Sequence, residues 1–187
     1  HITDEIRRNI KLLGAKYDYD FVITEIGGTV GDIESLPFIE SVRQLRWELG
    51  SKNSYCVHLT YVPYVAAAGE VKTKPTQHSV KNLQSSGVQP DMLVLRTEHT
   101  LNKDILKKVA LFCNVDSDAV IQSVDVSTIY EVPLKMQEQE MDEIILRKLG
   151  MPVGAKPELK PWKAFLNKKK NATETIKIGL VGKYVEL

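Results

Sequence analysis

Apolar residues recur along most of the chain at two spacings, one typical of helices and one typical of buried strands. In ITDEIRRNIKLLG, residues 2–14, they return every three or four positions, which predicts a helix that ends at Gly14. The run DFVITEI, residues 20–26, is short and rich in β-branched residues, so we predict a buried strand there. Pro37 then opens a second predicted helix, which ends at Gly50.

The alternation of strand and helix patterns continues to residue 150. We predict strands at 54–63, 91–97 and 118–126, and helices at 74–87, 102–114 and 133–150. Strands that alternate with helices predict an α/β fold, a doubly wound and mostly parallel sheet with helices on both faces. Such sheets bind ligands at the carboxyl ends of their strands.

The pattern changes after residue 151. Residues 152–175 contain three prolines, a KKK run and little periodicity, so we predict an interdomain linker. The following TIKIGLVGKYVEL is apolar and β-branched, and we predict that residues 176–187 form the first strand of a further, truncated domain. Residues 1–151 are then the principal, partial domain of the chain.

Composition narrows the possible partners. The chain has 25 Lys and Arg against 24 Asp and Glu, a net charge of +1, so charge gives no case for nucleic acid or an anionic membrane. No apolar run reaches the roughly 18 residues that a membrane span needs. Cys56 and Cys113 lie in apolar stretches, which favours buried reduced thiols and a cytoplasmic location.

The stretch EIGGTVGDIES, residues 25–35, is an acidic glycine-rich segment that follows the first predicted strand. Glu25 is a candidate Mg²⁺ ligand, because Mg²⁺ takes one or two protein carboxylates together with substrate phosphates. Asp32 and Glu34 are candidates for binding hydroxyls or amines of a ligand. A solvated strand end for Glu25, and capping of the following helix for Asp32 and Glu34, remain alternatives.

The second candidate segment is basic. In GEVKTKPTQHS, Lys72 and Lys74 directly precede a predicted helix, where free N–H groups, the helix dipole and two ammonium groups favour a triphosphate. Two exposed lysines without a ligand are the alternative, and we interpret His58 and His78 as structural. The pattern G-x-x-x-x-G-K-[ST] does not occur, so the chain carries the acidic half of a nucleotide site without a phosphate loop.

Four stretches resemble the CTP synthase family: EIGGTVGDIESLPFIESVRQL, GEVKTKPTQHSVKNLQSSGVQPDMLVLR, KKVALFCNV and IGLVGKYVEL. The resemblance implies an amidoligase domain of P-loop type, a linker and a glutamine amidotransferase domain. It implies ATP- and Mg²⁺-dependent amination of UTP to CTP, with ammonia from glutamine, and feedback binding of CTP. The family's phosphate loop would lie upstream of His1 and its amidotransferase triad beyond Leu187, so we expect this chain alone to be inactive.

The resemblance also implies roles for residues of this chain. Glu25 matches a magnesium ligand, and ATP is the co-substrate. Residues matching the UTP and CTP site are Asp32, Ile33, Glu34, Lys72, Thr73, Lys74, Pro75, Thr76, Gln77 and Lys108. Val124, Asp125 and Val126 match a stretch that lines the adenine pocket of the ATP site. The family assembles as dimers and tetramers, with the matching segments meeting at a subunit interface.

Two other functions remain open at this stage. One is a non-catalytic nucleotide-binding or assembly module that keeps the fold without a phosphate loop. The other is a different P-loop amidoligase, which the KTKPTQ segment disfavours. A gene that continues upstream with a strand and a phosphate loop would exclude the first of these.

Overall fold

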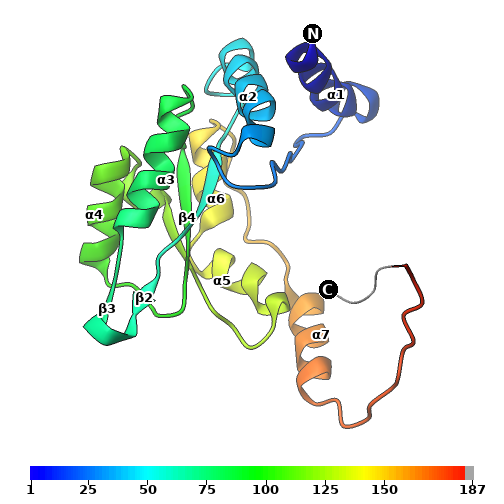
Figure 1. Ribbon diagram of the computed structural model, residues 1–187. Helices are drawn as coiled ribbons and strands as arrows, with labels where there is room; N and C mark the ends of the chain where they lie inside the picture. The colour runs from blue at the N-terminus through cyan, green and yellow to red at the C-terminus, as the bar shows by residue number, and fades with distance from the viewer. Residues whose placement is uncertain (184–187) are drawn as a thin grey trace. The chain divides into compact units, whose positions relative to one another are not determined.

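The computed structural model describes residues 1–183 and divides into two compact units, His1–Val153 and the remainder from Gly154. The first contains the sheet and most of the helices (Figure 1).

A three-stranded parallel sheet forms the centre of the first unit. Its strands are β1 (Val57–Tyr61), β4 (Met92–Thr97) and β5 (Val120–Val124), in the order β1-β4-β5. Helix α3 (Lys74–Ser85) connects β1 to β4, and α4 (Lys103–Cys113) connects β4 to β5. These strands and helices lie where the sequence pattern predicts them, and the α/β fold with a parallel sheet is confirmed.

The apolar core lies on both faces of β4. Leu93 and Leu95 pack in one cluster with residues of α3 and α4, including Val80 and Val109. Met92 and Val94 pack in a second cluster with Ile144 of α6 (Met141–Lys148). In Figure 1, α3 and α4 accordingly lie on one side of β4 and α6 on the other. The run MLVL does not alternate apolar with polar residues, as is typical of a strand that is covered on both faces.

Strand β1 is covered on one face only. His58 and Thr60 are buried, whereas Val57, Leu59 and Tyr61 are 42%, 64% and 47% exposed. Alternate residues of a strand point to opposite faces, so the apolar stripe of β1 lies beside Met92 and Val94 but beyond the reach of α6. This half of the sheet therefore keeps an uncovered apolar face within the described residues.

The predicted strand at residues 20–26 is wrong. The segment has no regular secondary structure, and Phe21 and Ile23 are 47% and 94% exposed. An apolar run becomes a parallel strand only when a neighbouring strand pairs with its backbone. Within residues 1–183 no strand pairs with this segment, so Glu25 follows an extended stretch rather than a buried strand.

Helix α1 (Ile2–Tyr17) continues beyond Gly14, so the predicted end is also wrong. The helix ends at Asp18, which takes the left-handed conformation at φ 51° and donates its N–H to the Gly14 carbonyl. A helix ends where a residue can leave its geometry with satisfied hydrogen bonds, and a glycine inside it is tolerated at modest cost.

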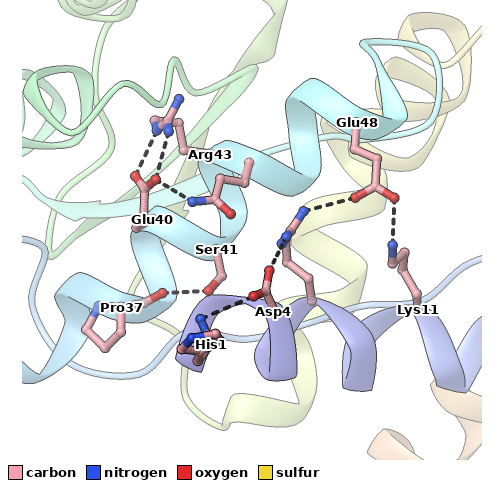
Figure 2. Close-up of polar contacts among 10 residues, drawn as sticks. His1, Asp4, Lys11, Pro37, Glu40, Ser41, Arg43 and Glu48 are labelled. Atoms are coloured by element: carbon pink, nitrogen blue, oxygen red, sulfur yellow. Dashed lines mark hydrogen bonds and ion pairs between the residues drawn. The ribbon is translucent and has the colours of Figure 1, made fainter.

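Helix α2 (Leu36–Leu49) ends at Gly50 as predicted and packs against α1. Glu48 of α2 accepts hydrogen bonds from Lys11 at 2.6 Å and from Arg7 at 3.3 Å (Figure 2). No residue of α1 is fully buried, and the two ion pairs with Glu48 lie at the surface. Exposed pairs of this kind each stabilise by about 0–1 kcal/mol.

Three further features depart from the sequence pattern. An antiparallel hairpin, β2 (Tyr64–Val65) and β3 (Glu70–Val71), lies between β1 and α3. The single helix predicted at 133–150 is two helices, α5 (Val132–Glu138) and α6, because Glu140 at φ 56° interrupts the helical backbone. Short 3₁₀ turns occupy Ile33–Ser35, Ala66–Ala68, Ser117–Ala119 and Ile129–Glu131.

The second unit contains helix α7 (Lys160–Lys170), inside the segment predicted as an irregular linker. The rings of Trp162 and Phe165 contact each other along it, with centroids 5.5 Å apart. The strand predicted at 176–187 is absent from residues 176–183, where Ile176 and Ile178 are 80% and 83% exposed; residues 184–187 lie outside the described part. None of the helices in residues 1–183 has the length and apolar character that a membrane crossing requires.

Candidate functional site

The acidic segment forms a glycine turn that packs over α2 and α3. Gly28 and Gly31 have φ angles of 82° and 107°, which side chains with a Cβ rarely adopt. Ile26 and Val30 pack against the cluster formed by Ile39, Leu83 and Val88. These contacts fix the turn while Glu25 and Glu34 remain exposed to solvent, as does Ile33 at 81%.

The carboxylate of Asp32 is engaged inside this turn. Its Oδ2 accepts a hydrogen bond from the Thr29 N–H at 3.2 Å, and its carbonyl accepts from the Ser35 hydroxyl at 2.8 Å. The Asp32 side chain therefore holds the turn before α2 but does not cap a helix, since neither the 3₁₀ turn Ile33–Ser35 nor α2 has a side-chain cap hydrogen bond. Ligand binding by Asp32, Ile33 and Glu34 remains a prediction.

The described residues offer few protein ligands for a magnesium ion. Among the described residues, no group of three or more His, Cys, Asp or Glu side chains is placed to hold a metal ion. Glu25 is a single exposed carboxylate beside a turn whose glycines leave room for a ligand. One carboxylate fits Mg²⁺ when substrate phosphates supply further oxygen ligands.

The basic segment places a helix N-terminus at the carboxyl end of β1. Thr73 is the N-cap of α3, and the Gln77 N–H bonds to the Thr73 carbonyl at 3.1 Å. The first N–H groups of a helix have no intrahelical partner, Pro75 carries none and Thr76 is buried, so Lys74 is the exposed residue that supplies an N–H at this end of α3. Such a terminus attracts anions.

Thr76 is completely buried, backbone included, and offers no group to a ligand. Its side chain is completely buried, and its hydroxyl lies 3.1 Å from both the Thr60 hydroxyl and the Tyr61 carbonyl. Beside it, the Gln77 amide donates to the Thr73 hydroxyl at 3.3 Å. The two bonds of the Thr76 hydroxyl anchor α3 to β1.

The hairpin brings two of the predicted phosphate-binding lysines to one carboxylate. Lys72 forms an ion pair with Glu70, and the pKa of the Glu70 carboxyl is lowered, first by the hydrogen bond from Lys72 and its charge and further by the charge of Lys108 on α4. The sequence alone did not single out Glu70. Glu70 lies two residues before Lys72, and side chains at this spacing in an extended segment point to the same side, so the sequence did contain a signal for this pair.

The predicted adenine-pocket residues lie at the carboxyl ends of β4 and β5. Val124 is the last residue of β5, and the Asp125 N–H bonds to the Thr97 carbonyl at 3.0 Å. The Asp125 carboxylate lies 3.8 Å from Nε of Arg96, and both side chains are largely exposed. Ligand binding by Val124, Asp125 and Val126 remains a prediction on this edge of the sheet.

The acidic and basic segments lie at opposite ends of α3. A Cβ added to Gly31 would lie 3.8 Å from the Asn82 amide nitrogen, in the last turn of α3, whereas Lys74 begins that helix. Eight residues of helix separate these positions by about 12 Å.

His58, which the sequence indicates as structural, is buried against α3. Its Nε2 lies 2.9 Å from the Ser79 hydroxyl, and burial lowers the pKa of its imidazole. Cys56 and Cys113 are both free thiols, and burial raises the pKa of each, that of Cys113 to about 11. These groups belong to the packing of the sheet and not to the candidate site.

A hollow of 570 Å³ lies away from every predicted site residue, between α1 and α2. It is lined by Arg7, Arg43, Gln44, Trp47 and Glu48. Its arginines are already paired, Arg43 with Glu40 and Arg7 with Asp4 and Glu48 (Figure 2). We assign no ligand to it.

Comparison with known proteins shows the family. The family described as CTP synthase N-terminus matches residues 1–151. Proteins named CTP synthase from Bacteroides fragilis and Porphyromonas gingivalis are 73% and 74% identical to all 187 residues, and one from Flavobacterium johnsoniae is 62% identical. The chain covers 35%, 34% and 35% of these relatives, about a third of their length. The chain therefore belongs to the CTP synthase family.

Proposed function

We propose that this chain supplies the acceptor-nucleotide half of the amidoligase site of a CTP synthase. The reaction is the ATP- and Mg²⁺-dependent amination of UTP to CTP with ammonia derived from glutamine, and CTP binds back as an inhibitor. The observation that carries the proposal is the basic segment at the start of α3: Lys74 begins the helix, and Lys72, two residues before it, pairs with Glu70, whose carboxyl pKa is also lowered by the charge of Lys108. We infer the ligand of this segment from the family membership.

In this proposal the triphosphate of UTP or CTP binds the N-terminus of α3. The ammonium group and the N–H of Lys74 hold phosphate oxygens, while Lys72 and Lys108 add charge from the hairpin and from α4. Transfer of a phosphoryl group depends on positioning and on stabilising charge more than on covalent chemistry from the protein. The role of this segment is therefore to fix the acceptor nucleotide.

Glu25 would hold Mg²⁺ together with the phosphates of ATP, and the ion would neutralise charge that develops during phosphoryl transfer. Residues 124–126, at the ends of β4 and β5, would contact the adenine ring. The acidic and basic segments, at opposite ends of α3, would meet across the subunits of a homo-oligomer. We propose a cytoplasmic enzyme of dimers and tetramers, without nucleic acid or membrane as a partner.

The test uses a full-length chimera in which this chain replaces the matching 187 residues of the Bacteroides fragilis relative. Lys74→Ala should weaken UTP and CTP together by roughly ten- to a hundredfold, the loss expected for one charge-assisted phosphate contact. ATP affinity should change far less. Lys81→Ala is the matched control, because Lys81 is exposed on the same helix beyond its first turn.

Calorimetric titration of the three nucleotides separates the outcomes. An equal loss for UTP, CTP and ATP would indicate general misfolding of the variant, and a loss confined to ATP would refute the assignment of the segment. Nucleotide binding by the chimera without ammonia-dependent formation of CTP would favour a non-catalytic module.

A further inference from the structure

The β2–β3 hairpin places an acidic and a basic side chain on the same face. Val71 packs against the apolar core, so its two neighbours, Glu70 and Lys72, project to the opposite, solvent side. The backbone fixes this arrangement, because Glu70 pairs with Val65 in the hairpin and the Lys72 N–H bonds to the Pro63 carbonyl at 2.9 Å. The ion pair between Glu70 and Lys72 is thus built into the hairpin.

The carboxylate of Glu70 contacts Lys72, one of the cations of the proposed triphosphate site. Lys72 donates to Glu70 Oε1, and Lys108 of α4 is close enough for its charge to act on the same carboxyl group. A phosphate oxygen that binds Lys72 must compete with this carboxylate for the ammonium. The bound phosphates also experience repulsion from it, since both groups are negative.

We infer that Glu70 is an internal counter-anion of the triphosphate site, which occupies Lys72 in the free protein and gives way when the nucleotide binds. This inference rests on the proposed function and adds a residue that lowers the affinity of the site. A weaker site suits a segment proposed to bind both UTP and CTP, because a lower affinity lets bound CTP dissociate faster. Glu70 acts by competing for Lys72 and by repelling the phosphates, and it does not hold the nucleotide.

The experiment compares the chimera with its Glu70→Gln variant by calorimetric titration of UTP and CTP. The amide keeps the size of the side chain and removes its charge. We expect both nucleotides to bind about three- to tenfold more tightly in about 0.1 M salt, the range for one charge near the surface. In about 1 M salt the gain should largely disappear, because screening then acts over about 3 Å.

Glu138→Gln is the matched control. Glu138 pairs with Lys135 on α5, and the two side chains are 61% and 48% exposed, against 57% and 47% for Glu70 and Lys72. Removing this carboxylate should leave the affinity for UTP and CTP unchanged. Inorganic tripolyphosphate, titrated in parallel, should also bind Glu70→Gln more tightly, because the effect concerns phosphates and not the base.

Each outcome decides the inference. Weaker binding by Glu70→Gln would show that the carboxylate orients Lys72 for the ligand, and unchanged binding would show that the ion pair has no effect; both overturn it. A gain that persists in about 1 M salt would have a cause other than charge and would also overturn it. If Lys74→Ala leaves UTP and CTP binding intact, the proposed function fails by itself, whatever Glu70→Gln does.

Discussion

Arg46 of α2 donates a hydrogen bond to the carboxylate of Asp91 at 2.7 Å. The same carboxylate oxygen accepts the N–H of Cys56 at 2.8 Å. The two side chains are 20% and 16% exposed, so this ion pair is mostly removed from water. It ties α2 to the residues that precede β1 and β4, and thereby joins the helix after the acidic turn to the sheet.

Asp91→Asn should destabilise the protein by about 1–3 kcal/mol, because the amide keeps the shape while Arg46 loses its charged partner in a half-buried position. The measurement is urea unfolding followed by circular dichroism. Glu138→Gln, which breaks a well-exposed pair, should change the free energy of unfolding by less than about 1 kcal/mol. Equal losses in the two variants would show that the burial of the Arg46–Asp91 pair has no energetic consequence.

The hydroxyl of Tyr55 is buried without a protein hydrogen-bond partner among the described residues. Burial, and then the charges of Asp91, Asp118 and Asp116, raise its pKa from 10.0 to about 12. Between these values the unfolded chain has lost the proton and the folded chain keeps it, so stability falls as the pH rises.

Tyr55→Phe should therefore reduce the loss of unfolding free energy between about pH 10 and about pH 12. Urea unfolding at both pH values measures it. Tyr17→Phe is the control, because Tyr17 is 50% exposed. If Tyr55→Phe loses as much unfolding free energy between these pH values as the unmodified protein does, groups other than Tyr55 cause the loss.

Glu25→Gln in the full-length chimera should abolish formation of CTP from UTP and free ammonia, since the amide retains the shape of the side chain and loses the charge proposed to bind Mg²⁺. Glutamine hydrolysis should continue, because it belongs to separate chemistry. Both rates are measured on the same preparation. Near-normal ammonia-dependent activity would remove Glu25 from the metal site.

Trypsin should cut the chain first between Lys168 and Lys177. Residues 171–183 are exposed and have no regular structure, and the last turn of α7 carries three consecutive lysines. Ordering a backbone residue costs about 1–2 kcal/mol, and few buried apolar contacts offset that cost here. Mass spectrometry of early digests identifies the site, and initial cleavage at Lys72 or Lys107 would contradict this prediction.

The parts of the fold that sequence predicted best are those whose contacts are local or enclosed. The run MLVLRT predicts β4 because a strand covered on both faces tolerates only apolar residues, and α3 and α4 show helical spacing over a full element. Residues 20–26 carry an equally good strand pattern. Their pattern failed because pairing depends on a neighbouring strand, which a local sequence pattern does not reveal.

The sequence predicted which segments form the candidate site, but not how their side chains are arranged in space. The lysines and the helix start at Lys74 could be predicted from charge and from Pro75. That Thr76 turns its hydroxyl inward depends on its partner at Thr60 in another element. That Glu70 reaches Lys72 depends on a hairpin whose alanine-rich loop gives a weak turn signal. Long-range partners decided each of these points.

The one-sided covering of β1 has a consequence for the behaviour of the chain in solution. Within the described residues only β4 pairs with β1, so its other edge presents backbone N–H and C=O groups beside the exposed side chains of Leu59 and Tyr61. An unprotected edge next to an apolar stripe is a template for strands of other molecules. Aggregation of this chain at high concentration should therefore begin at β1, and its solubility should depend on that strand more than on the net charge of +1.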